Sequence, residues 1–326
     1  MVVVKEDNRL RKETRCRSWW FSAFLFPFCS FAVVSASIAL GVVLQQMERG
    51  YENPDVLYAG FSPPAYSKEV IESLRGKTLT NLDEVAASIN YTNFEISPYP
   101  NDLGYDTHID TSKNCYVAFE SASNRSFYSL HSLTPKEAEA RNVTAKNIFL
   151  THENHCGVCS SLDDLALYLE KPDMTEPVRK CGFRLIKKRG VACLQSLGFS
   201  HACSWAWFWN TRSTRKNCLP VCLRYITAPN NMPTKGRNYC EPQYCENTIN
   251  GQPACSNSSW KRGYYRLNPC ISCDECRSGP VFKRTAGRTR RASGAPSAIR
   301  RDPSLVAEVT HFYGSPSVEW DDTNAR

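Results

Sequence analysis

The chain has 326 residues, of which 42% are hydrophobic and 22% are charged, and its formal net charge is +8. A charge of +3 arises in residues 1–18 alone, which carry six Lys or Arg and three Asp or Glu. The overall charge therefore does not by itself indicate a nucleic-acid partner, and we expect none.

The first predicted element is a membrane-spanning helix at residues 19–44, WWFSAFLFPFCSFAVVSASIALGVVL. These 26 residues include no Asp, Glu, Lys, Arg or His, and about 20 apolar residues are enough to cross the hydrocarbon core of a bilayer. A signal peptide cleaved near Ser35-Ala36-Ser37 is the alternative. The apolar run is longer than the ~7–15 residues of that class, so the pattern favours an uncleaved signal anchor.

The charges on either side of the predicted anchor indicate its orientation. Six positive residues precede it, whereas the residues just after it, from Glu48 to Asp55, are mostly acidic. Positive residues stay on the cytoplasmic side of a membrane. We therefore expect a basic cytoplasmic tail at residues 1–18 and a type II, single-pass topology. The ectodomain is expected in the secretory lumen or outside the cell, on a Golgi or plasma membrane.

Two further features of the predicted ectodomain agree with a lumenal location. Glycosylation sequons of the form Asn-x-Ser/Thr occur at Asn90, Asn124, Asn142 and Asn257, and such sites receive sugar in secreted proteins. Fourteen of the 16 cysteines follow the anchor. This even number is typical of a disulfide framework in an oxidising compartment. We predict a glycosylated, disulfide-stapled body.

The first part of the ectodomain is predicted to be a stalk and a small core. Residues 45–75 contain several Pro and Tyr residues and end in a predicted short helix at 67–74. Residues 76–155 contain one cysteine, Cys115, and are predicted to form an ordinary α/β core.

Strand and helix signals within residues 76–155 are local and short. Alternating apolar residues predict strands at 116–119 and 126–130, joined in a hairpin whose tip carries a sequon. The stretch Thr134-Pro135-Lys136-Glu137 predicts a helix start, because it combines a capping residue, a proline at the first helical position and a Glu at the third. Residues 147–150 predict another strand.

Residues 156–280 are predicted to form a cysteine-rich region of helices and loops, because they contain 13 of the 16 cysteines. Four apolar residues from Leu162 to Leu169 fall on one helical face behind a capping Ser161. A second helix is predicted to begin near Thr175. The sequence assigns no secondary structure to the aromatic cluster at 205–209, and residues 240–276 are predicted to be loop-rich.

The stretch His152-Glu153-Asn154-His155-Cys156-Gly157-Val158-Cys159 follows a predicted strand and precedes a predicted helix. A Cys-x-x-Cys at a helix N-terminus has a stabilised thiolate. This arrangement resembles the redox turn of thioredoxins and protein disulfide isomerases. The resemblance implies a lumenal thiol-disulfide oxidoreductase with Cys156 attacking and Cys159 resolving. It departs from those families because His155 stands in place of their Trp, and we favour structural disulfides at both cysteines.

The same stretch offers four ligands of the types that zinc prefers, namely His152, His155, Cys156 and Cys159. Adjacent ligands such as His155 and Cys156 suit one tetrahedral ion poorly, and lumenal thiols are usually oxidised before they bind metal. We therefore favour no metal site and expect no cofactor.

The cysteine spacing also resembles that of saposin-like helical domains. The six cysteines concerned are Cys156, Cys159, Cys181, Cys193, Cys218 and Cys222, with Cys203 in excess. The resemblance implies contact with lipid or a membrane surface through Trp205, Trp207 and Trp209. The pattern favours the alternative that these aromatic side chains fill a small core beside disulfides.

The C-terminal segment, residues 281–326, is predicted to be a basic, partly disordered tail. Seven Lys or Arg lie between positions 283 and 301, interspersed with Gly, Ala, Ser and Pro. An exposed segment of this kind binds anionic glycans or lipids. Residues 305–313 predict a last strand.

The chain lacks the sequence signatures of the common hydrolases and transferases. The sequence thus predicts an α+β membrane protein whose ectodomain acts in binding or assembly, not in catalysis. Its ligand and its protein partner stay open. The oxidoreductase and the saposin-like, lipid-interacting module are the alternatives.

Overall fold

The computed structural model describes residues 66–99, 110–121, 123–145, 147–232, 248–249, 252–253 and 265–313. All of them belong to the second of two units into which the chain divides, which begins at Leu57. The predicted cytoplasmic tail and the anchor at 19–44 lie outside the described residues. Among the residues that are described, no helix combines the length and the apolar character needed to span a membrane.

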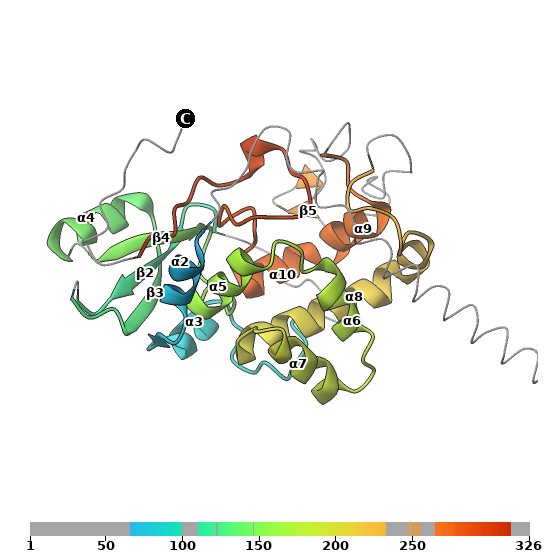
Figure 1. The fold of residues 1–326 in the computed structure, drawn as a ribbon, viewed down its shortest axis with the longest axis horizontal. Coiled ribbons are helices and arrows are strands. Elements are labelled where there is room, and N and C mark those ends of the chain that lie inside the picture. Colours follow the sequence, from blue (N-terminus) through green and yellow to red (C-terminus); the bar gives the residue numbers. More distant parts are fainter. Residues whose placement is uncertain are drawn as a thin grey trace, which may run out of the picture. The chain divides into compact units, whose positions relative to one another are not determined.

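A four-stranded sheet forms one part of this unit (Figure 1). Its strands are β1 (Thr78–Leu79), β2 (Asn114–Phe119), β3 (Phe127–Leu133) and β4 (Ile148–Glu153), in the order β1-β3-β2-β4. β2 pairs in antiparallel fashion with both β3 and β4, whereas β1 runs parallel to β3. The predicted hairpin and the strand predicted at 147–150 are confirmed.

The two faces of the sheet bury different residues, because successive side chains of a strand point to opposite sides. Cys115, Val117 and Phe119 of β2 belong to the main core, whereas Tyr116 packs with Ala138 of helix α4 (Pro135–Ala145) on the other face. α4 begins with the predicted capping box. The backbone N–H of Thr134 donates to Glu137 Oε2 at 2.8 Å, and the Glu137 N–H donates to Thr134 Oγ1 at 3.3 Å.

The main core continues from the sheet into helices. α2 (Lys68–Leu74) packs against α5 (Leu162–Glu170), and α3 (Leu82–Ser88) packs against β3. The predicted helices at 67–74 and 162–169 are confirmed. In α5 the hydroxyl of Ser161 accepts the N–H of Asp164, and the predicted apolar face is buried.

Five helices form the other part of the unit, together with the long segment that follows them. They are α6 (Thr175–Gly182), α7 (Lys187–Ser196), α8 (His201–Arg224), α9 (Pro269–Arg277) and α10 (Gly279–Ala286). α8 contacts each of the other four (Figure 1). The predicted helix at Thr175 is confirmed. Short pieces complete the chain: β5 (Thr248–Ile249), β6 (Gln252–Pro253) and the 3-10 turn η4 (Pro303–Leu305).

Disulfides join these elements, as predicted. The pairs are Cys115–Cys156, Cys159–Cys203, Cys181–Cys193, Cys218–Cys273 and Cys222–Cys270. Cys276 is disulfide-bonded too. So many cross-links indicate that this body matures in an oxidising compartment, either secreted or lumenal. Four of the five pairs span more than 40 residues: one joins β2 to the turn after β4, one joins this turn to α8, and two join α8 to α9.

Three sequence predictions for the C-terminal third are wrong. The stretch from Cys270 to Cys276, predicted as loop, is helix α9, because the side chain of Asn268 accepts the Cys270 N–H and Pro269 occupies the first turn. The basic segment is not an exposed tail, since Arg284 and Arg288 are buried.

The third error concerns the strand expected at 305–313. Ala307, Val309, His311 and Tyr313 are buried while the residues between them are exposed, so the alternation is present. The backbone nevertheless joins no strand of the sheet: the Ala307 N–H donates to the carbonyl of Arg291, within the preceding loop. Periodic burial thus occurs here without a strand ladder.

Candidate functional site

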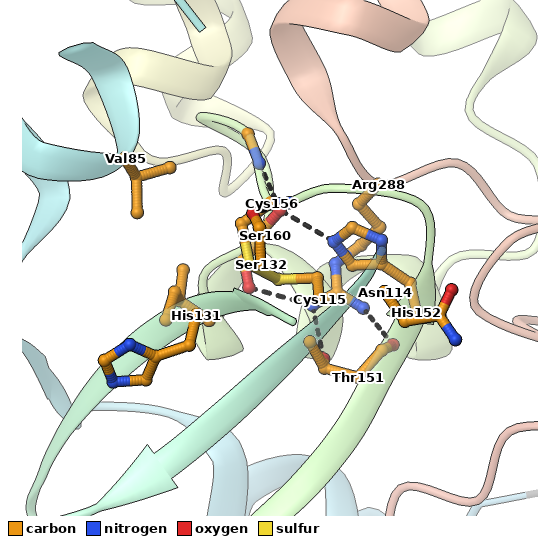
Figure 2. Close-up of a disulfide and its surroundings, with 12 residues drawn as sticks. Val85, Asn114, Cys115, His131, Ser132, Thr151, His152, Cys156, Ser160 and Arg288 are labelled. Carbon is orange, nitrogen blue, oxygen red and sulfur yellow. Dashed lines mark hydrogen bonds between the residues drawn. A yellow bond between two sulfur atoms is a disulfide. The ribbon is translucent and has the colours of Figure 1, made fainter. Parts of the chain in front are cut away.

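The Cys-Gly-Val-Cys turn connects β4 to α5 and is bonded to two distant elements. Cys156 bonds to Cys115 on β2 (Figure 2), and Cys159 bonds to Cys203 on α8. All four residues are buried. The structure therefore does not bring Cys156 and Cys159 together as a redox pair, and neither is a free thiol that could attack a substrate.

The glycine of this turn is required by close packing. A Cβ at Gly157 would lie 2.5 Å from the carbonyl carbon of Ala286, and Gly287 has a φ of 70°. The N–H groups of Val158 and Cys159 donate to the carbonyls of Thr285 and Ala286 at 2.9 and 3.0 Å. The turn and the end of α10 thus meet backbone to backbone, which only glycine permits.

The two histidines of the turn are hydrogen-bonded within the protein. His152 Nδ1 lies 2.8 Å from the Glu153 carbonyl oxygen, and Nε2 lies 2.7 Å from Ser160 Oγ. Since a carbonyl only accepts, Nδ1 carries the proton and the Ser160 hydroxyl donates to Nε2. Burial, reinforced by the charge of Arg288, lowers the pKa of His152 well below 6.5. His152 and Ser160 are fully buried, so this pair supports the turn and meets no solvent.

The zinc-ligand alternative is not supported either. His155 Nε2 lies 2.8 Å from the carbonyl oxygen of Arg284, and both neighbouring cysteines are in disulfides. No group of three or more His, Cys, Asp or Glu in the described ranges is arranged to hold a metal ion.

Arg288 is the largest fully buried side chain in the described unit and lies beside this turn (Figure 2). Its Nε donates to the Cys159 carbonyl at 3.1 Å and Nη1 to the Thr151 carbonyl at 3.1 Å. Nη2 donates to Thr151 Oγ1 at 2.7 Å and to the Ser160 carbonyl at 2.9 Å. Burial lowers the pKa of Arg288 below its ordinary value. The guanidinium joins β4, the turn and the C-terminal segment.

The structure places the sequons as follows. Asn90 lies two residues after the end of α3 and has a φ of 56°, Asn124 lies in the β2–β3 hairpin and Asn142 lies on α4, all three exposed. Asn257 lies outside the described residues. Their glycosylation stays a prediction.

The three tryptophans predicted as contact residues lie against the core, and one of them also lines a pocket. Trp205 is buried, and its ring stacks on Trp209, whose Nε1 donates to the Phe94 carbonyl at 2.9 Å. Trp207 donates from Nε1 to the Tyr168 hydroxyl at 3.1 Å. The core interpretation of this cluster is confirmed, because all three pack against the main core. Trp207, however, also lines a pocket.

This pocket, hereafter the α6–α10 pocket, is the candidate functional site. It has a volume of about 280 Å³ and is lined by α6, α8, α9, α10 and residues 289–301. Much of its wall is apolar and includes Val178, Trp207, Ile271 and Phe282. The volume lies near the lower end of the ~300–1,000 Å³ typical of small-molecule sites.

Six cationic side chains and two carboxylates also line the α6–α10 pocket: Arg179, Arg215, Lys283, Arg290, Arg291, Arg301, Asp274 and Glu275. Glu275 is the centre of a charge cluster, with its carboxylate oxygens 2.7 Å from Arg301 Nη2, 3.4 Å from Arg291 Nη2 and 3.6 Å from Lys283 Nζ. Burial opposes ionisation of Glu275, but the three cations outweigh it and hold its pKa well below 4.5. Three cations thus share one carboxylate.

One donor of this cluster stands out. The side chain of Arg301 is 8% exposed, and its Nη1 is buried without a hydrogen-bond acceptor among the described residues. A buried donor that lacks an acceptor costs roughly 1–3 kcal/mol or more. This donor belongs to a pocket-lining residue and suits an anion.

Asp274 is the second carboxylate of the pocket. It accepts hydrogen bonds from the Thr214 hydroxyl and from Asn210 Nδ2, the latter at 3.4 Å. Burial raises the pKa of Asp274 to about 6, the Thr214 hydrogen bond opposes this, and the charge of Glu275 adds to it. Asp274 is therefore mostly ionised at pH 7 and becomes protonated as the pH falls below about 6.

Sequence reasoning missed this cluster. The run Cys270-Ile-Ser-Cys-Asp-Glu-Cys276 was interpreted through its thiols, and the adjacent acids inside it were the available signal. The basic residues that follow were predicted to form an exposed, partly disordered tail, whereas three of them neutralise Glu275.

Comparison with known proteins gives one match. A family of unknown function (DUF8771) matches residues 187–253 and 235–309, which together cover less than half of the chain and include α7 to α10. No curated protein and no solved structure matches the chain.

Proposed function

We propose that this chain is a type II, single-pass membrane protein whose glycosylated, disulfide-stapled outer body binds an acidic amphiphile in the α6–α10 pocket. The ligand has an apolar chain or ring system and one carboxylate or phosphate. The anchor at residues 19–44 and the four sequons support the membrane and glycan parts of the proposal. The role is binding, since the buried disulfides of Cys156 and Cys159 offer no reactive thiol.

The observation that carries the proposal is the combination of an apolar wall with an excess of partly buried cations, six against two carboxylates. Apolar residues such as Trp207 and Phe282, whose ring centroids are 4.5 Å apart, favour a hydrophobic ligand body. Arg301 Nη1 is a charged donor in need of an acceptor. A ligand anion beside Arg301 would satisfy this donor and reduce the repulsion among three cations that share Glu275.

Two ligands that differ only in charge test the proposal. Decanoate and decanol have the same chain length, and their binding to the full-length protein is measured by isothermal titration calorimetry in one detergent. A hydrogen bond to a charged group contributes about 1.5–3 kcal/mol, so decanoate should bind at least about tenfold more tightly. Equal affinities, or no binding of either compound, would refute the proposal.

Two variants test whether the preference for decanoate over decanol arises at Arg301. Arg301→Met removes the donor and leaves Lys283 and Arg291 to neutralise Glu275, so it should bring the decanoate-to-decanol ratio close to one. Arg189→Met changes an exposed arginine of α7 that does not line the pocket and should keep the ratio unchanged.

A further inference from the structure

One stretch of the chain is basic and free of acids. Between Glu176 and Glu241 there is no Asp or Glu, and residues 177–232 contain ten Lys or Arg. These residues form most of α6, all of α7 and all of α8. Their charge is not explained by the Glu275 cluster, whose three cations come from α10 and the segment after it.

Large apolar side chains are exposed on the same stretch. Leu185 is 78% exposed in the connection between α6 and α7, and Phe183 and Ile186 beside it are about half exposed. On α8, Leu219 and Leu223 are exposed and lie one helical turn apart, on one face. Exposed apolar groups of this extent mark interaction sites.

These side chains belong to one surface, because Phe183, Leu219 and Leu223 all line the α6–α10 pocket. The connection between α6 and α7 is constrained by a disulfide, which joins Cys181 at the end of α6 to Cys193 in α7. Gly182 packs so closely on α8 that a Cβ there would lie 2.8 Å from Thr211 Cβ. We call this the α6–α8 surface. It comprises Phe183, Leu185, Ile186, Leu219, Leu223 and the exposed cations Arg184, Lys188, Arg189, Lys216 and Arg224.

We infer that the α6–α8 surface docks on an anionic phospholipid bilayer, with its apolar side chains inserted among the acyl chains and its cations among the headgroups. Apolar residues next to several basic ones, as in Phe183-Arg-Leu-Ile-Lys-Lys-Arg189, are typical of segments that lie in the membrane interface. No carboxylate of the stretch repels the lipid phosphates. The hairpin and α4, which carry the sequons Asn124 and Asn142, are separate from α6–α8 (Figure 1).

This docking would place the mouth of the α6–α10 pocket at the bilayer, so an acidic lipid could enter it directly. That consequence rests on the proposed function, whereas docking itself does not require the pocket to bind a ligand. The predicted anchor would raise the effective concentration of the surface at the bilayer.

The test is hydrogen exchange of the full-length protein in nanodiscs of phosphatidylcholine alone and in nanodiscs with about one-third phosphatidylglycerol. If nine in ten copies are docked, the peptide covering residues 183–189 should exchange about tenfold more slowly in the anionic discs. About 0.5 M salt should remove most of this protection, since it screens surface charges within a few ångströms.

Variants separate docking from loss of folding. The double variant Leu185→Ser with Ile186→Ser changes exposed side chains and should lose the protection, whereas Leu305→Ser, an exposed leucine of η4, should keep it. Arg301→Met should also keep the protection of residues 183–189, although this variant should no longer discriminate decanoate from decanol. Equal protection in both kinds of disc would overturn the inference. So would protection that appears without lipid and rises with protein concentration, which would indicate a protein partner.

Discussion

The buried guanidinium of Arg288 gives the sharpest test of how this fold is held together. We compare Arg288→Lys with Arg288→Met. Arginine makes four hydrogen bonds from three nitrogen atoms, to two groups of Thr151 and to the carbonyls of Cys159 and Ser160. The acceptors surround one planar fork, which a lysine cannot match because its ammonium is a single point with three donors.

The expected loss of stability follows from the hydrogen-bond acceptors that each substitution leaves without a donor. Arg288→Met leaves three carbonyls without this donor, which costs roughly 3–9 kcal/mol in total, and removal of the buried charge's desolvation cost offsets part of this. Removing one partner of a buried charged interaction typically costs about 3–5 kcal/mol, and we expect a net loss of this size in the free energy of unfolding. Lysine keeps a buried charge while losing the geometry, so Arg288→Lys should be no more stable than Arg288→Met.

The assay is equilibrium urea denaturation with the disulfides intact, followed by tryptophan fluorescence and far-UV circular dichroism. Arg184→Met is the matched control, because Arg184 is exposed, and it should change the stability by less than about 0.5 kcal/mol. If Arg288→Lys retains stability within about 1 kcal/mol of the wild type, the site requires only a positive charge and the argument from geometry is wrong.

Two further predictions concern the same body. The pKa of Asp274 is raised from 3.8 to about 6, so the folded state holds an extra proton between these values. The contribution of Asp274 to stability should therefore fall as pH rises from 4 to 6, by no more than about 3 kcal/mol, while buried His152, whose pKa is lowered, contributes in the opposite direction. The prediction therefore concerns the difference in unfolding free energy between the wild type and Asp274→Asn in urea titrations, which should change by this amount over the range; a difference that is the same at pH 4 and pH 6 would contradict it. Loss of the Cys159–Cys203 bond, through serine at both positions, opens a sequence separation of 44 residues. It should lower the denaturation free energy by about 4 kcal/mol, and a loss below about 1 kcal/mol would show that this bond is dispensable.

Local elements could be predicted because their signals act within a few residues. Ser161 caps α5 through an atom three residues away, and Thr134 and Glu137 cap each other over the same distance. The hairpin of β2 and β3 likewise follows from a short turn between two alternating segments. Neighbouring residues determine such hydrogen bonds almost regardless of the rest of the fold.

The α6–α10 pocket could not be predicted, because no local pattern specifies it. Its charged part joins Glu275 of α9 to Arg301, which lies 26 residues further along the chain. The composition of residues 283–301 indicates only that they are basic. Whether a basic side chain stays in solvent or becomes buried depends on whether the fold places a carboxylate next to it. In this fold, Glu275 lies next to Arg291 and Arg301.

By itself, the sequence determined the mixed α+β class, the oxidising compartment and the positions of α2, α4, α5, α6, β2, β3 and β4, since these follow from composition and from contacts between near neighbours. Only the tertiary structure decided the cysteine partners, the burial of Arg288 and the assembly of the pocket. Many pairings of the same cysteines satisfy the sequence equally well. The partner of Cys156 is Cys115 because the packing of the sheet brings the Cα atoms of these two residues within 4.7 Å.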